Sequence, residues 1–274
     1  YIPSFTDKFR IDWYQIFLKE IAKNIEIKNT EKNKNSFALI WYLFDRNEWD
    51  NLWNISELRR IFKNLWVEIN CVWLDWGNFN DLKNVEKSEL IVSLPYWKMA
   101  WKILSKRLWV KNIELEVPFW IKSIIDFVKK ICLEFDLDQD FVNQYLKMEL
   151  NDIKTKVDML DDYVFLNKNV IYAWDPNLLE NIRDITEYLW MNLVFSYSYL
   201  WDKQPEWQDF NNKNINLVIW NSDFNNQSNF KIDYEKKLEF WFPSYNTHYL
   251  VPTPFMWFEW MKYFIQSIYN KLNN

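Results

Sequence analysis

The sequence predicts an α/β protein made of two domains, each with a parallel sheet that helices cover on both faces. Short apolar runs of strand length alternate with amphipathic runs of helix length, which is typical of parallel sheets covered by helices. These runs fall into two groups, and a charged, helix-like segment at 140–165 separates them. The length of 274 residues suits two domains of ordinary size. We therefore expect domains at residues 1–150 and 151–274.

The first domain is expected to open with a helix at 11–28 and to end with the linker helix. A loop at 45–54 should be followed by a helix that Asn54 or Ser56 caps, because both side chains can accept backbone hydrogen bonds. The expected strands lie at 36–44, 67–74, 88–96 and 112–119, and the expected helices at 55–65, 97–108 and 120–135, with a helical turn at 80–85.

The second domain repeats this alternation. Pro176 stands in the first turn of a predicted helix, a position that favours proline. The expected strands lie at 169–173, 191–198, 215–220 and 238–242, and the expected helices at 176–189 and 257–272. The two domains therefore look like two copies of one architecture, although no residue-level repeat is evident.

Glycine is almost absent from this chain, and tryptophan is abundant. The sequence holds one glycine, Gly77, and 19 tryptophans, whereas average usage predicts roughly 19 glycines for this length. Trp66, Trp109 and Trp190 each follow a helix-like run and precede a strand-like run. That position after a helix commonly requires positive φ and is usually occupied by glycine.

The distribution suggests that most or all of the 19 tryptophans are glycines in the organism. A gene whose UGA codons mean glycine would give this pattern if it were translated with UGA read as tryptophan. The alternative is a tryptophan-rich protein with real aromatic clusters. The chain as written should fold poorly, because an indole side chain disfavours positive φ and adds apolar surface to tight turns.

Charge and composition exclude several classes of protein. The net charge of −5 does not indicate a nucleic-acid-binding surface, which is usually basic. No run of residues approaches the 18 consecutive apolar residues of a membrane span. The start of the chain lacks the features of a signal peptide, and because it begins with Tyr1 we expect an N-terminally truncated fragment. Cys71 and Cys132 form neither a disulfide framework nor a metal site, and we expect them to be buried thiols in a reducing cytoplasm.

Ligands of open α/β sheets bind beyond the carboxyl ends of the strands. Four segments occupy such positions, at 41–50, 93–97, 174–177 and 220–223, and each of them also fits an ordinary turn between a strand and a helix. None matches a phosphate-binding motif. The chain's one histidine, His248, lies between the last predicted strand and helix and suits a hydrogen-bonding loop residue or a ligand. No metal site or catalytic triad is evident.

With glycine at the tryptophan positions, the sequence resembles the nitrogenase component 1 family, and its β-type subunits most. Residues 241–260 then read GFPSYNTHYLVPTPFMGFEG, which is similar to the family's GFPxxxxH…GxxG signature. Residues 168–177 read KNVIYAGDPN, similar to a GKRVAIxGDPD strand, and 217–222 resemble DLxIGNS. The segments at 94–97 and 117–120 read LPYG and VPFG, similar to the family's paired strand ends. These pieces follow the family's order along the chain.

The resemblance implies an α/β fold of two Rossmann-like αβα domains with parallel sheets over this chain. It also implies a subunit of a nitrogenase-like oxidoreductase in the cytoplasm. Such a subunit pairs with a homologous subunit, receives electrons from an ATP-dependent iron–sulfur reductase and passes them to a substrate. An iron–sulfur cluster is implied, with its ligands mostly in a first domain expected before Tyr1. Leu94 stands about where the α-type subunit has a cofactor-ligating cysteine, which argues against an iron–molybdenum cofactor here. The candidates for lining the interdomain cleft are His248, Tyr96, Asn221 and Ser222.

Two alternatives to a catalytic subunit share this fold. One is a scaffold or maturation protein that assembles or carries a metallocofactor without turnover. The other is a non-catalytic binding protein that uses only its cleft.

Overall fold

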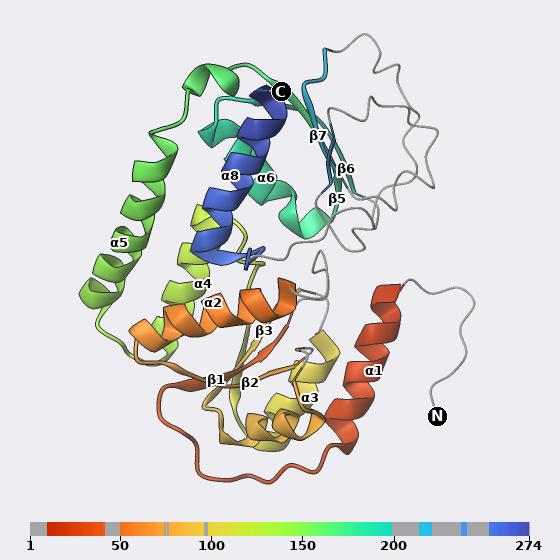
Figure 1. Cartoon of the computed structure of the whole chain (residues 1–274). Helices are drawn as coiled ribbons and strands as arrows, with labels where there is room; N and C mark the ends of the chain where they lie inside the picture. Colours follow the sequence, from red (N-terminus) through yellow and green to blue (C-terminus); the bar gives the residue numbers. More distant parts are fainter. Residues whose placement is uncertain are drawn as a thin grey trace. The chain divides into compact units, whose positions relative to one another are not determined.

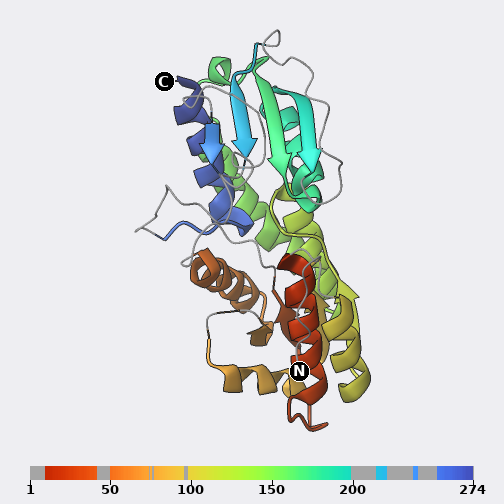
Figure 2. The same cartoon turned by 90° about the vertical axis from the view of Figure 1, so that its right-hand side faces the viewer.

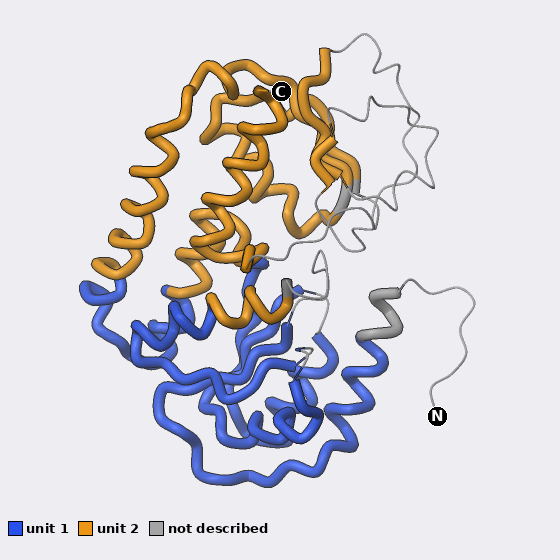
Figure 3. Tube along the Cα trace, in the orientation of Figure 1, with its two compact units in different colours: residues 1–43, 58–117, 129–142 blue, residues 44–57, 118–128, 143–274 orange. Residues whose placement is uncertain are grey.

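The computed structural model contains two compact units, each with a parallel sheet (Figures 1 and 2). Figure 3 colours the units: the first holds residues 1–43, 58–117 and 129–142, and the second holds 44–57, 118–128 and 143–274. The sheets lie on either side of residue 150 in sequence, and the domain boundary at that residue remains a prediction. The structure describes residues 10–41, 50–73, 75, 77–95, 98–198, 214–220, 237–239 and 252–273.

The first sheet has four parallel strands in the order β2-β1-β3-β4. The central strand β1 is buried along its whole length, as expected for a parallel sheet covered on both faces. Its register with β2 shifts between Phe37 and Ala38. The strands are β1 (Ser36–Ile40), β2 (Glu68–Trp73), β3 (Leu90–Ser93) and β4 (Lys111–Glu114).

Helices cover both faces of the first sheet. Ala38 and Ile40 of β1 belong to a core cluster with α1 (Arg10–Asn24) and α3 (Lys98–Leu108), which lie side by side (Figures 1 and 2). Phe37 points to the opposite face and packs edge-on against Phe62 of α2 (Asp50–Asn64), with ring centroids 5.0 Å apart. A 3₁₀ segment, η1 (Phe79–Lys87), connects β2 to β3.

The second sheet repeats the first, with the parallel order β6-β5-β7-β8. Its central strand also shifts register against its neighbour after the second residue, between Val170 and Ile171. The prediction of two copies of one architecture, and of two Rossmann-like α/β folds, is confirmed. The strands are β5 (Asn169–Trp174), β6 (Asn192–Ser198), β7 (Leu217–Trp220) and β8 (Lys237–Glu239).

In the second unit, α6 (Leu179–Tyr188) and α8 (Trp257–Asn273) lie on the same face of the sheet (Figures 1 and 2). Helix α8 buries Phe258, Met261, Ile265 and Ile268, whose spacing is that of one apolar helix face. The remaining helical elements are α4 (Ile121–Glu134), α5 (Gln139–Val157) and two 3₁₀ turns, η2 (Asp162–Val164) and η3 (Pro176–Leu178). Within the described ranges, no helix is both long enough and apolar enough to cross a lipid bilayer.

Several element boundaries differ from the sequence prediction, among them those of α1, α2 and β4. Helix α2 begins at Asp50, so the predicted loop at 45–54 is wrong over its last residues, and Asn54 lies inside the helix instead of capping it. Strand β4 ends at Glu114 rather than 119, because its partner β3 offers only four residues for pairing. Helix α1 ends at Asn24, four residues before its predicted end.

Candidate functional site

The carboxyl end of β5 forms a tightly hydrogen-bonded turn. Asp175 follows the strand and caps η3, because its Oδ1 accepts hydrogen bonds from the backbone N–H and the side-chain Nδ2 of Asn177, both at 2.9 Å. The hydroxyl of Tyr172 donates to the backbone carbonyl of Asp175 over 2.8 Å. Pro176 fixes the backbone at the start of the turn. These contacts hold the carboxyl group of Asp175 in one orientation.

Asp175 is a carboxyl group with altered proton affinity. Only 1% of the residue is exposed, and burial raises the pKa of Asp175 to about 7, against the lowering effect of the Asn177 hydrogen bonds. A carboxyl group that is partly protonated near neutral pH can donate or accept a proton or a hydrogen bond. Because ligands of α/β sheets bind at this edge, Asp175 is the strongest titratable candidate in the described part of the second unit.

The next strand of the same sheet ends in an aromatic residue. Trp220 closes β7, is 4% exposed, and has the ammonium group of Lys237 4.4 Å from its ring centroid. This distance suits a cation–π interaction. A ring and a cation therefore lie at the carboxyl end of the sheet that also carries Asp175.

The carboxyl end of the first sheet is filled by large apolar side chains. Trp41, Trp73 and Leu94 are fully buried there. The indole N–H of Trp73 donates to the carbonyl of Leu82 over 3.3 Å. Beyond β2, burial raises the pKa of Asp75, whose carboxylate accepts a 3.0 Å hydrogen bond from the N–H of Gly77.

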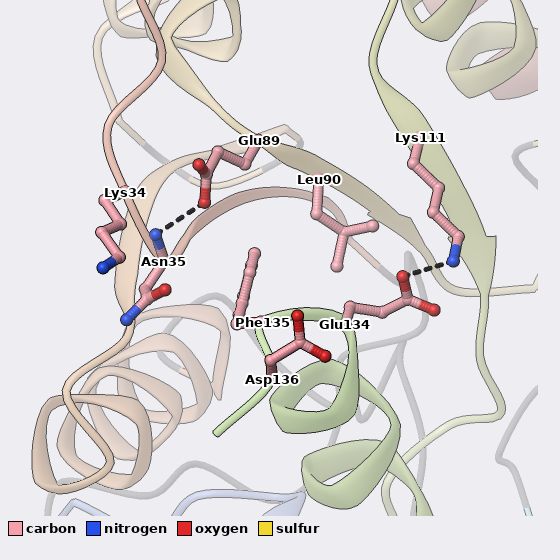
Figure 4. A pocket seen from close by; sticks show the side chains of 8 residues that line it. All are labelled: Lys34, Asn35, Glu89, Leu90, Lys111, Glu134, Phe135 and Asp136. Carbon is pink, nitrogen blue, oxygen red and sulfur yellow. Dashed lines mark hydrogen bonds and ion pairs between the residues drawn. The ribbon is translucent and has the colours of Figure 1, made fainter. Parts of the chain in front are cut away.

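A cavity of about 320 Å³ opens at the opposite, amino end of the first sheet (Figure 4). Two polar contacts are made within its lining: Lys111 pairs with Glu134 at 2.5 Å, and Glu89 accepts a 2.7 Å hydrogen bond from the backbone N–H of Asn35. The side chain of Leu90 lies between these two pairs. Lys34 and Asp136 also line the cavity, so its lining carries charges of both signs and indicates no single ligand class. The cavity lies away from the edge where ligands were predicted.

The four predicted pocket residues, His248, Tyr96, Asn221 and Ser222, lie outside the described residues, so their roles remain predictions. The sequence did place a segment of interest at 174–177, but it gave no special weight to Asp175. The available signal was an acidic residue directly after a buried strand, followed by proline and asparagine. That pattern also fits any capped turn, and burial of the carboxyl group could not be read from it.

The two cysteines are buried and free, as predicted. Burial raises the pKa of Cys71 far above its usual range and that of Cys132 to about 12, so both are protonated thiols. Iron–sulfur clusters are held by thiolates, usually four of them. The described ranges also contain no group of three or more His, Cys, Asp or Glu residues that could hold a metal ion. The two cysteines and the other described residues therefore do not fit an iron–sulfur cluster.

The fold matches solved structures of nitrogenase. A structure of nitrogenase Cp1 at pH 6.5 superposes with a TM-score of 0.71 over 96% of this chain, at 14% sequence identity. A second structure, of nitrogenase Cp1 at pH 5, matches over 69% of this chain and 38% of the nitrogenase chain, with a TM-score of 0.52 and 12% sequence identity. The chain spans 65% of the length of the first structure. No family model matches the sequence, and no curated protein matches it.

Proposed function

We propose that this chain is part of a subunit of a nitrogenase-like oxidoreductase. The subunit receives electrons from an ATP-dependent iron–sulfur reductase and passes them to a substrate. The observation that carries the proposal is the match to nitrogenase Cp1, which extends over 96% of the chain and so includes both sheets. At 14% identity this match establishes the fold alone, so the activity rests on additional support.

The additional support is the sequence resemblance to the nitrogenase component 1 family. One matching segment, 168–177, folds as strand β5 followed by the capped η3 turn, which is the structure expected of a strand-and-turn motif at a sheet edge. Another, 117–120, leads directly into α4. The motifs keep the family's order along the chain, which favours common ancestry over an accidental likeness of folds.

In this proposal the chain acts as a β-type subunit in the cytoplasm. It builds the interface with a homologous subunit and contributes to a pocket with His248, Tyr96, Asn221 and Ser222. An iron–sulfur cluster serves the complex, and its ligands lie mostly beyond the residues of this chain. When bound, such a cluster would supply one-electron transfer.

The proposal is tested on the complex as it exists in the host. The chain is tagged in its own organism and purified without oxygen, with the untagged strain as control. We expect a related second subunit to co-purify, together with iron and acid-labile sulfide. We also expect the complex to change its electron paramagnetic resonance signal when the reductase and MgATP are added. A chain that purifies alone and without iron would contradict the proposal.

The same preparation distinguishes a scaffold or maturation protein from a reductase subunit. A complex that carries metal but accepts no electrons from the reductase with MgATP would contradict catalytic electron transfer. A complex that accepts electrons and turns over a substrate would support it. The variant His248→Ala should leave subunit pairing intact and lower turnover, because its proposed role is in the pocket rather than the interface.

A further inference from the structure

Three helices in this protein end in tryptophan residues with left-handed backbone conformation. Trp66, Trp109 and Trp190 follow α2, α3 and α6, with φ angles of 59°, 54° and 55°. Residues with a side chain disfavour this region because Cβ approaches the backbone, and a bulky residue there is an outlier. Glycine has no Cβ and adopts this conformation freely.

The backbone around these residues forms the Schellman motif, in which glycine usually provides the left-handed residue. After α2, the N–H of Val67 donates to the carbonyl of Phe62 over 2.9 Å, and the N–H of Trp66 donates to that of Lys63 over 3.2 Å. After α6, the N–H of Met191 donates to the carbonyl of Thr186 over 2.8 Å, and the N–H of Trp190 donates to that of Glu187 over 3.1 Å. After α3, the N–H of Val110 donates to the carbonyl of Ser105 over 3.2 Å.

The indole side chains take no part in these motifs. Trp66, Trp109 and Trp190 are 80%, 88% and 73% exposed, so most of their large apolar surface faces solvent. The residues that follow them, Val67 and Val110 among others, are buried instead and provide the apolar contact typical of this motif. The turns therefore need the backbone conformation at these positions and do not need a side chain.

The other non-glycine residues with positive φ in the described ranges provide an internal comparison. They are Asn35, Asp136 and Asn167, residue types that tolerate this region, besides Trp257. Asp136 ends α4 in the same Schellman motif, with hydrogen bonds of 3.2 Å and 3.1 Å. Each left-handed position in the described ranges is thus occupied by Asn, Asp or Trp, and Gly77 is not among them.

Trp257 shows the same conflict in a buried position. Its φ is 73°, its side chain is fully buried, and its indole N–H donates no hydrogen bond to any described residue. The buried indole N–H groups of Trp41, Trp101 and Trp220 also lack a partner among the described residues. A buried donor without an acceptor destabilises a fold. Glycine at these positions would remove each of these donors.

We propose that positions 66, 109, 190 and 257 hold glycine in the protein that its own cell makes. The gene would carry UGA codons at these positions, and a tRNA charged with glycine would read them. Exposed indoles could instead serve as contacts for a partner protein, but a partner contact does not require left-handed backbone at three helix ends.

The first experiment is mass spectrometry of the protein purified from its host, together with sequencing of the gene. We expect peptides that cover positions 66, 109, 190 and 257 to carry the mass of glycine, and the codons to be UGA. UGG codons or tryptophan-containing peptides at these positions would overturn the proposal. Tryptophan at one position and glycine at the others would overturn it for that position.

The second experiment measures the thermal stability of variants that are produced in a host with the standard genetic code. Trp66→Gly, Trp109→Gly and Trp190→Gly are each expected to raise the midpoint of thermal unfolding by about 2–4 °C, since each relieves left-handed strain. Asp136→Gly is the matched control in the same motif and should raise it less. Trp53→Gly, in the interior of α2 where φ is negative, should lower it. Equal effects of Trp66→Gly and Trp53→Gly would overturn the conformational basis of the proposal.

Discussion

The side-chain oxygen of Asn54 accepts a 3.0 Å hydrogen bond from the backbone N–H of Met256, 202 residues further along the chain. It also accepts one from the N–H of Phe255, at 2.5 Å. Asn54, Phe255 and Met256 are fully buried, so the two backbone N–H groups just before α8 bond to Asn54 instead of to water. A polar side chain inside α2 thus fixes the start of the C-terminal helix.

Replacement of Asn54 by alanine should destabilise the protein strongly. Asn54→Ala leaves two buried N–H groups without their acceptor, and each such group costs about 1–3 kcal/mol. We expect the free energy of unfolding to fall by about 2–4 kcal/mol, measured by urea denaturation. Parent and variant must share the same residues at positions 66, 109, 190 and 257.

The control for this prediction is Asn64→Ala, at the exposed C-terminal end of the same helix. It should change the free energy of unfolding by no more than about 0.5 kcal/mol. Equal losses in the two variants would show that the hydrogen bonds of Asn54 are not important for stability.

Asn54 also illustrates why some helix boundaries could not be predicted. The strands and most helices were recognisable because their apolar residues recur at regular spacing, as in the fully buried β1 and β7. The first turn of α2 contains the polar residues Asn51 and Asn54, which the sequence assigned to a loop and a cap. Their burial depends on chain segments far away in sequence, and local patterns carry no information about such contacts.

The ends of α2, α3 and α6 were predictable from sequence. Trp66, Trp109 and Trp190 were expected at positions that require positive φ, and all three have it. The prediction worked because a left-handed residue between a helix and a buried strand is a local requirement. The raised pKa of Asp175, in contrast, depends on burial by the whole unit and could not be predicted from four residues of sequence.

Ser123 should contribute to stability through its hydroxyl group. Its Oγ accepts hydrogen bonds from the N–H groups of Phe119 and Trp120, both at 3.1 Å, and lies 2.7 Å from Oδ1 of Asn181, to which it can donate. Ser123→Ala removes these bonds at a buried position, and we expect a loss of about 2–3 kcal/mol in the free energy of unfolding, measured by urea denaturation. Thr155→Ala, on the exposed side of α5, should cost less than about 0.5 kcal/mol.

The two cysteines should resist alkylation in the folded protein. With a pKa of about 12, on the order of one in ten thousand Cys132 side chains is a thiolate at pH 8, and only the thiolate reacts. Cys71 is buried as well and has a still higher pKa. We expect iodoacetamide to modify neither residue in the native protein and both in urea, as measured by mass spectrometry. Rapid modification of Cys132 without urea would contradict the burial described above.

Asp175 should make stability depend on pH in a direction that is unusual for a carboxyl group. In the folded state its pKa is about 7, whereas an aspartate in an unfolded chain titrates near about 3.9. Between these values the folded state binds one more proton than the unfolded state. Stability from this group is therefore fully present below about pH 4, falls by up to about 1.4 kcal/mol per pH unit as pH rises, and levels off above about pH 7.

Asp175→Asn tests this pH dependence, because it keeps the size and capping ability of the side chain but cannot ionise. We expect the difference in unfolding free energy between parent and variant to change across pH 4–7 and to be constant above pH 7, measured by urea denaturation at each pH. Asp152, whose pKa is lowered by hydrogen bonds from Lys156 and Lys262, acts in the opposite direction and below about pH 4, outside this window. Parallel stability curves for parent and variant across pH 4–7 would show that the carboxyl group of Asp175 titrates normally.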